Sequence, residues 1–295
     1  MVFYLIGLGL GDEQDITLRG LETVRWCARV YLEAYTSVLP VDVARLERQY
    51  GQRVMLADRE MVEDGADDLL HGADTSDVAL LVVGDVFWAT THQDLWLRAR
   101  RRGIECAVVH NAGIMNAVGV CGLQMYRFGE TISLVWFTER WRPTSWYPRL
   151  AANRQRGLHT LCLLDIRVKE PTEESLARGK PVYEAPRFMS VAEAAQQLLQ
   201  VAAWRRERRN GQANPTNDAE APEPYCACAE AYTAQTLGIG LARAGQATQQ
   251  ILVGTLEQLA RAELGPPLHA LIIPGELHAL EAEFVATLPQ VSGRQ

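Results

Sequence analysis

An aspartate that follows an apolar segment is the first residue in this sequence that could do chemistry. Residues 78–83 form an uninterrupted apolar run that stops at Gly84-Asp85. A run without polar alternation is typical of a parallel strand that is covered on both faces, and ligands of open α/β sheets bind beyond the carboxyl ends of such strands. Asp85 is therefore a candidate for binding a hydroxyl or amine of a small cofactor. The alternative is an aspartate that only shapes the turn before the next helix.

A second candidate is the glycine-rich segment 7–12, which follows an N-terminal strand over residues 2–6. It begins like the G-x-G-x-x-G motif of dinucleotide-binding folds, but Asp12 stands where the third glycine should be. Because that glycine lets the helix pack closely on the strand, its replacement disfavours a nucleotide-dependent oxidoreductase. The alternative is a tight turn between a strand and a helix, which any parallel sheet needs.

The cysteines and histidines do not show the spacing of a metal site. Cys226 and Cys228 lack the C-x-x-C spacing and a matching second pair. The other four cysteines lie in apolar segments and are expected to be buried: Cys27, Cys106, Cys121 and Cys162. His92 and His159 are expected to be core histidines with partners inside the protein. We therefore predict that the protein binds no metal.

The overall composition is that of a globular protein that binds neither free nucleic acid nor a membrane. The chain has 295 residues, of which 48% are hydrophobic and 22% charged, and its formal net charge is −7. The absence of a basic surplus argues against free nucleic-acid binding. No signal peptide is recognisable, and no apolar stretch approaches the roughly 20 residues that span a bilayer. These features predict a cytoplasmic location.

The elements that must position Asp85 alternate between strands and helices in the first part of the chain. Strands are expected at 2–6, 30–33, 54–56, 78–83 and 105–109, and helices at 17–29, 41–50, 64–70 and 91–102. This alternation predicts an α/β domain over residues 1–111 with a mostly parallel sheet.

The pattern changes after residue 111 and predicts a second domain, over residues 112–295, with a mixed α/β sheet. Strands are expected at 131–135, 159–166, 237–242 and 268–273, and helices at 114–121, 190–205 and 248–259. Residues 141–147 form a loop dense in aromatic residues. Residues 210–223 are of low complexity, and we expect a variable, mobile insertion over 207–236.

Several short motifs occur in an order that resembles the diphthine synthase family, which shares its fold with the tetrapyrrole methylases. These motifs are residues 7–12, 84–85, 89–92, 111–112, 114–119, 121–124, 128–131, 141–143, 153–154, 157–161, 240–243 and 267–272. The resemblance covers nearly the whole chain except the segment at 207–236. Each motif is weak by itself, whereas the ordered series is specific.

The resemblance implies two α/β domains with S-adenosyl-L-methionine in the cleft between them, which yields S-adenosyl-L-homocysteine, and a homodimer. It also implies that the substrate is elongation factor 2, methylated on a histidine that carries an aminocarboxypropyl group. The archaeal type adds three methyl groups to the amine, and the eukaryotic type adds a fourth to the carboxylate. Residues 136–143 resemble the eukaryotic type, so we predict four methylations. The alternatives are a three-methyl enzyme and a catalytically impaired relative that still binds the cofactor.

The resemblance also implies which residues contact the cofactor. They are Leu10, Asp85, Trp88, Gly113, Ile114, Leu164, Ala244 and His269. From the residues alone, His269 would be a core histidine, and Leu10, Ile114, Leu164 and Ala244 would be plain core.

The sequence departs from the family pattern at or beside four of these positions. The family usually has Pro at Val86, Gly at Trp88, Ser at Gly113 and Val at Ala244. Trp88 matters most, because a glycine beside a cofactor allows close approach of the backbone. An indole at residue 88 would either fill that space or turn away from it.

The predicted chemistry requires alignment more than it requires an acid or a base. An α-amino group has a pKa of roughly 8, so on the order of a tenth is neutral at pH 7, and a carboxylate is fully ionised there. We therefore assign no dedicated base and expect the rate to come from proximity and orientation. The residues Trp141, Arg142, Trp146 and Tyr147 either dock the protein substrate or anchor their own loop.

Overall fold

The computed structural model describes residues 1–37, 39, 41–88, 90–139, 141–169, 183–209 and 231–292. Most of the expected insertion at 207–236 lies outside these residues, as do Cys226 and Cys228. Contacts within the chain define two compact units. The first contains Met1–Ala117, Ile166–Arg187 and Gly245–Ala247, and the second contains Val118–Asp165, Phe188–Ala244 and Thr248–Gln295.

The first unit is built on a parallel five-stranded sheet, as the alternation of elements predicts. Its strands are β1 (Val2–Gly7), β2 (Arg29–Glu33), β3 (Val54–Ala57), β4 (Val78–Val82) and β5 (Glu105–Val109), in the order β3-β2-β4-β1-β5. Every residue of β4 is buried, because helices cover both faces of the sheet. The predicted strands agree with the structure to within a residue or two.

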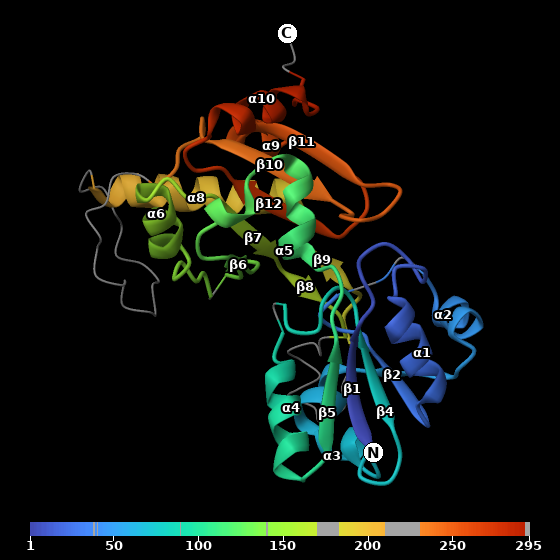
Figure 1. The fold of residues 1–295 in the computed structure, drawn as a ribbon. Coiled ribbons are helices and arrows are strands. Elements are labelled where there is room, and N and C mark those ends of the chain that lie inside the picture. The colour runs from blue at the N-terminus through green and yellow to red at the C-terminus, as the bar shows by residue number, and fades with distance from the viewer. Residues whose placement is uncertain are drawn as a thin grey trace. The chain divides into compact units, whose positions relative to one another are not determined.

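Helices cover the two faces of this sheet in separate groups (Figure 1). On one face lie α1 (Leu18–Trp26) and α2 (Val43–Tyr50), whose side chains pack with one apolar cluster. On the other face lie η1 (Glu60–Asp64), α3 (Ala66–Leu70) and α4 (His92–Arg101), which pack with a second cluster. The helix expected at 64–70 is therefore α3, preceded by one π-helical turn.

Two connections of this sheet leave in opposite directions, and they define where a ligand can bind. The chain passes from β1 over β4 to reach β2, and it passes from β4 over β1 to reach β5. The following helices α1 and α4 consequently lie on opposite faces of the sheet. The ends of β1 and β4 form the topological switch point, which is where open α/β sheets bind ligands.

The second unit contains the predicted mixed sheet. Its strands are β6 (Ile132–Leu134), β7 (Thr160–Leu164), β10 (Leu237–Ala242), β11 (Gln250–Thr255) and β12 (His269–Ile273), in the order β11-β10-β12-β7-β6. Only the β6–β7 pair is parallel, and the three other pairs are antiparallel. Two short strands, β8 (Ile166–Arg167) and β9 (Arg187–Phe188), form a separate sheet.

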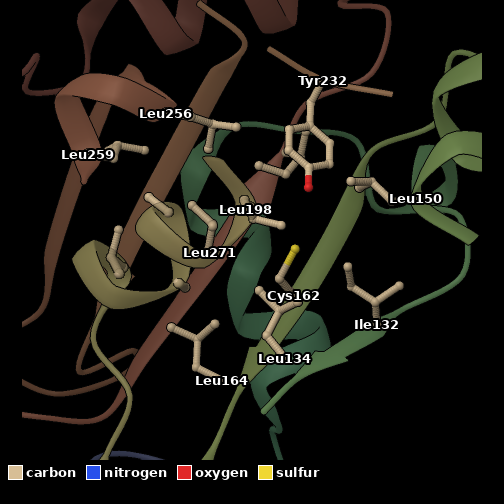
Figure 2. Close-up of a cluster of buried hydrophobic side chains, with 14 of the residues drawn as sticks. Ile132, Leu134, Leu150, Cys162, Leu164, Leu198, Tyr232, Leu256, Leu259 and Leu271 are labelled. Atoms are coloured by element: carbon tan, nitrogen blue, oxygen red, sulfur yellow. The ribbon is translucent and has the colours of Figure 1, made fainter. Parts of the chain in front are cut away.

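An apolar core joins this sheet to the long helix α8 (Val191–Arg209). In Figure 2, Leu198 of α8 lies beside Leu271 of β12, and Cys162 of β7 lies near Leu134 of β6. Both Leu198 and Cys162 are fully buried. The remaining helices are α5 (Ile114–Ala117), which belongs to the first unit, and η2 (Val118–Cys121), η3 (Met125–Arg127), α6 (Tyr147–Gln155), α9 (Leu256–Leu259) and α10 (Ala279–Thr287), which belong to the second.

The prediction of a helix over residues 248–259 is wrong for most of that range. Residues 250–255 form the edge strand β11, which pairs with β10 over its whole length. The helix α9 starts only after Thr255, whose side chain accepts a hydrogen bond from the backbone N–H of Gln258, while the Gln258 side chain bonds back to Thr255. This capping box marks a helix start that the hydrophobic periodicity obscured.

The aromatic loop at 141–147 is anchored by part of its own aromatic residues. Trp146 and Tyr147 are buried in the core of the second unit, whereas Trp141 is 47% exposed. The Arg205 guanidinium lies 3.8 Å from the centre of the Tyr147 ring. Two of the four residues considered for docking are thus structural. No helix within the described residues is both long and apolar enough to cross a membrane.

Candidate functional site

Two glycines allow the loops at the carboxyl edge of the first sheet to close together. Gly9 follows β1 and Gly84 follows β4, and the Gly84 N–H donates to the Gly9 carbonyl at 2.7 Å. A Cβ on Gly7 would lie 2.7 Å from the Gly84 carbonyl oxygen and 2.9 Å from Asn111 Cβ. Residue 7 must therefore lack a side chain, because the loops after β4 and β5 pack over the end of β1.

Asp85 is the polar centre of this edge. Its Oδ2 accepts hydrogen bonds from His110 Nδ1 at 2.8 Å and from the Asn111 N–H at 3.1 Å, and its Oδ1 accepts one from the Phe87 N–H at 3.2 Å. Its side chain is only 11% exposed. An ionised carboxylate offers about four lone-pair positions, so one on Oδ1 is still available. Asp85 thus shapes its loop, as the turn interpretation predicts, and it can also accept one bond from a ligand.

Asn111 ties the three loops of this edge into one framework. Its side-chain amide donates to the Gly7 carbonyl at 3.0 Å and to the Asp15 carbonyl at 2.9 Å. Asp15 in turn accepts the Gly11 N–H at 2.7 Å through its side chain. These bonds fix the backbone of the turn after β1, because its polar groups are held by side chains from other segments.

Four of the five predicted site residues of the first unit lie around Gly84. A Cβ on Gly84 would be 3.6 Å from both Leu10 Cδ2 and Gly113 Cα. A Cβ on Gly113 would be 3.2 Å from Trp88 Cδ1 and 3.5 Å from Asp85 Cβ. The indole of Trp88 therefore crowds the position that a Cβ at residue 113 would take, and it stays 42% exposed. The fifth residue, Ile114, follows directly as the first residue of α5.

The three predicted site residues of the second unit lie at one end of neighbouring strands. His269 opens β12 and pairs with Ala242 of β10, and Ala244 follows two residues later. The register of β12 and β7, in which Ala270 pairs with Leu163, places Leu164 at the same end. Leu164, Ala244 and His269 are therefore gathered in one place, although they are far apart in the sequence.

His269 has protein partners for both of its ring nitrogens. Its Nδ1 accepts a hydrogen bond from the Val191 N–H at 3.3 Å, and its Nε2 therefore carries the proton that is donated to the Pro266 carbonyl at 3.0 Å. Burial lowers the pKa of the imidazole, which favours this neutral form. A ligand contact by His269 would use its ring face or its backbone.

Two other histidines are core residues, as the sequence predicts. His159 is fully buried and contacts Glu281 Oε1 through Nε2 at 3.1 Å, while its Nδ1 accepts the Gly275 N–H at 3.0 Å. His92 is fully buried and contacts the Val86 carbonyl through Nδ1 at 3.0 Å. Within the described residues, no cluster of three or more acidic, histidine or cysteine side chains could hold a metal ion.

Sequence reasoning missed His110, although the signal that identified Asp85 also applies to it. His110 follows the strand β5 directly, just as Asp85 lies at the end of the β4 strand. Its imidazole is 69% exposed and binds Asp85. Both side chains project from the carboxyl edge of one parallel sheet, where ligand-binding residues collect.

Comparisons with known proteins agree over almost the whole chain. The family model of the tetrapyrrole (corrin/porphyrin) methylases matches residues 2–209. The diphthine methyl ester synthases of Mus musculus and Homo sapiens are each 54% identical over 286 residues, which is 97% of this chain and 95% and 94% of the relatives. A crystal structure of diphthine synthase superposes with a TM-score of 0.76 at 28% identity, covering 98% of this chain and 96% of its own.

A second crystal structure, of a provisionally named diphthine synthase of Entamoeba histolytica, has a TM-score of 0.80 at 40% identity and covers 99% of both chains. The similarity to these proteins thus covers both units of the chain. The chain is a methyltransferase that belongs to the tetrapyrrole methylase family and, within it, to the diphthine methyl ester synthases.

Proposed function

We propose that this protein methylates the aminocarboxypropyl-histidine of elongation factor 2, with S-adenosyl-L-methionine as the methyl donor, in diphthamide biosynthesis. The observation that carries this proposal is the 54% identity to diphthine methyl ester synthases over 97% of the chain. Residues 136–143 favour the eukaryotic type, so we propose four methylations that end in the methyl ester. We also propose a homodimer in the cytoplasm.

The carboxyl edge of the first unit fits such a cofactor. Gly84 lies between the apolar side chain of Leu10 and the backbone of Gly113, and the space over it has no side chain of its own. Asp85 Oδ1 keeps one acceptor position, which suits a hydroxyl or an amine. We propose that these residues, together with Ile114 and Trp88, hold the cofactor, and that Leu164, Ala244 and His269 contribute to its binding.

The residues of this edge would act by orientation. The bound cofactor supplies a methyl group on a positively charged sulfur. Asn111 and Asp15 hold the backbone of the turn after β1, and Asp85 holds the loops after β4 and β5. Such a fixed frame aligns the reacting atoms in advance, and orientation of this kind can be worth roughly 7–11 kcal/mol of the barrier.

The test is a methylation assay read by intact mass. Elongation factor 2 that carries the aminocarboxypropyl-histidine is incubated with the protein and S-adenosyl-L-methionine. A gain of four methyl groups supports the proposal, and a gain of three assigns the three-methyl type. Retained cofactor binding without any mass gain would identify a catalytically impaired relative, an alternative motivated by Val86 and Trp88.

A pair of variants tests the role given to Asp85. Asp85→Asn should weaken cofactor binding about 10- to 100-fold in calorimetry, since a hydrogen bond to a charged group contributes about 1.5–3 kcal/mol. The control is Glu22→Gln, which removes an exposed carboxylate from α1 of the same unit. Equal cofactor affinities of Asp85→Asn and the wild-type protein would show that Asp85 does not contribute to cofactor binding.

A further inference from the structure

The Asp85–His110 pair has the arrangement of a histidine base that is oriented by a carboxylate. His110 Nδ1 lies 2.8 Å from Asp85 Oδ2. Because an ionised carboxylate can only accept hydrogen bonds, Nδ1 carries the imidazole proton and Nε2 carries the free lone pair. The carboxylate is 11% exposed, whereas the imidazole is 69% exposed. A largely buried acid thus fixes the tautomer and orientation of a histidine whose side chain is mostly exposed.

His110 differs in this respect from His159 and His269, whose side chains are less exposed. Both ring nitrogens of His159 and of His269 have protein partners. The Nε2 of His110 has no hydrogen-bond partner among the described residues, and its ring has an edge contact with Phe87, with ring centres 6.3 Å apart. Asp85 is the only ionisable side chain in the described part of the chain that the structure pairs with it.

Three of the four steps of the proposed reaction release a proton, for which the sequence alone assigned no base. An amine must lose a proton from its ammonium form before it can attack a methyl group, and at pH 7 only on the order of a tenth of an α-amino group is neutral. A carboxylate attacks without losing a proton. A base in the site would therefore accelerate the transfers to nitrogen and leave the transfer to oxygen unchanged.

We propose that His110 Nε2 accepts the ammonium proton of the substrate before each methyl transfer to nitrogen. This proposal rests on the function proposed above. The freed lone pair of the nitrogen forms the new N–C bond, while the C–S bond breaks and the sulfur keeps its electron pair. His110 then releases the proton to water. Asp85 stabilises the imidazolium that forms transiently, as the carboxylate does in a catalytic triad.

The decisive variant is His110→Asn. The asparagine amide can keep the hydrogen bond to Asp85, because its nitrogen occupies a place close to that of Nδ1, but it offers no base. His71→Asn is the matched control, because His71 is an exposed histidine that follows α3, and it lies at the opposite edge of the sheet, ahead of β4. Single-turnover rates of each methyl transfer are measured by intact mass between pH 6.5 and 9.

We expect His110→Asn to slow the transfers to nitrogen about tenfold at pH 7, which is the factor by which the neutral amine is scarce there. The deficit should vanish toward pH 9, because the amine then loses its proton to solvent. Transfer to the carboxylate should keep its wild-type rate, measured on a factor that was fully methylated and then hydrolysed at the ester. Cofactor affinity in calorimetry should also be unchanged.

Two results would overturn the inference. Wild-type rates on nitrogen at pH 7 would show that His110 accepts no proton, and an equal slowing of all four transfers would show that it only supports the loop. A wild-type protein that methylates nothing would instead refute the proposed function, and the assignment of His110 with it.

Discussion

Replacement of Glu281 by alanine should destabilise the second unit by about 2–6 kcal/mol. Glu281 is 1% exposed and lies in the first turn of α10. Its Oε1 accepts the backbone N–H of Gln124 at 2.8 Å and His159 Nε2 at 3.1 Å, and its Oε2 accepts the backbone N–H of His278 at 2.7 Å. The carboxylate thus joins three separate segments through one buried side chain.

The magnitude follows from the donors that alanine would leave behind. His159 is fully buried and the half-buried Gln124 directs its N–H at the buried Glu281 carboxylate, so both donors would lose their partner with little access to water. A buried donor without a partner costs about 1–3 kcal/mol, which gives about 2–6 kcal/mol for the two. His278 is exposed, so its N–H can be hydrated and adds little.

The assay is urea unfolding of the full chain followed by circular dichroism, with two comparison variants. Glu281→Gln keeps one oxygen for Gln124 and His159 but presents its amide to the His278 N–H. It should therefore lower the free energy of unfolding by less than Glu281→Ala does. Glu283→Ala removes an exposed carboxylate from the same helix and should change the free energy of unfolding by less than about 0.5 kcal/mol. The reasoning is refuted if Glu281→Ala costs less than about 1 kcal/mol or no more than Glu281→Gln.

Three further predictions concern packing and pH. Gly7→Ala should destabilise the first unit by about 1–3 kcal/mol and weaken cofactor binding, because the new Cβ would lie 2.7 Å from the Gly84 carbonyl oxygen. Urea unfolding measures the loss of stability, and calorimetry measures the loss of affinity. Unchanged values of both would contradict the close packing at Gly7. Gly113→Ala should be better tolerated together with Trp88→Ala than alone, with a coupling of at least about 0.5 kcal/mol in a double-mutant cycle, because the added Cβ meets the indole. Stability should fall as the pH drops below about 6.5, because burial lowers the pKa of His159 in the folded state and the unfolded chain therefore binds the proton more readily. The unfolding midpoint between pH 8 and pH 5.5 measures this loss, which His159→Gln should reduce.

The position of Asp85 could be predicted from the sequence because two local signals coincide there. The apolar run of β4 identifies a strand buried on both faces, and its abrupt end identifies the edge at which ligands bind. The pairing of Asp85 with His110 could not be predicted in the same way, because the two residues are 25 positions apart and meet through the strand order β4-β1-β5. Strand order is a property of the whole sheet, and periodicity does not contain it.

The elements that the sequence did not predict are those stabilised by tertiary contacts. Residues 250–255 are a strand because β10 offers its edge, and this pairing outweighs their helix-compatible pattern. The helix α6 was not predicted, since aromatic residues obscure its start; Trp146 and Tyr147 are buried there only because the core of the second unit surrounds them. The helix α10 was not predicted either, and its first turn depends on the buried Glu281.

Trp88 and Gly113 are two departures from the family pattern, and they contact each other in the structure. Considered separately, a tryptophan in place of a usual glycine would obstruct the loop, and a glycine in place of a usual serine would leave it short of a side chain. The structure places the indole of Trp88 against residue 113, so that an added Cβ there would lie 3.2 Å from Trp88 Cδ1. The large residue and the missing side chain therefore compensate for each other within the loop after β4 and the segment after β5. Because Trp88 Cδ1 is turned toward Gly113 and Asp85 remains bonded to both segments, the departure changes the wall of the proposed site and preserves its acidic centre.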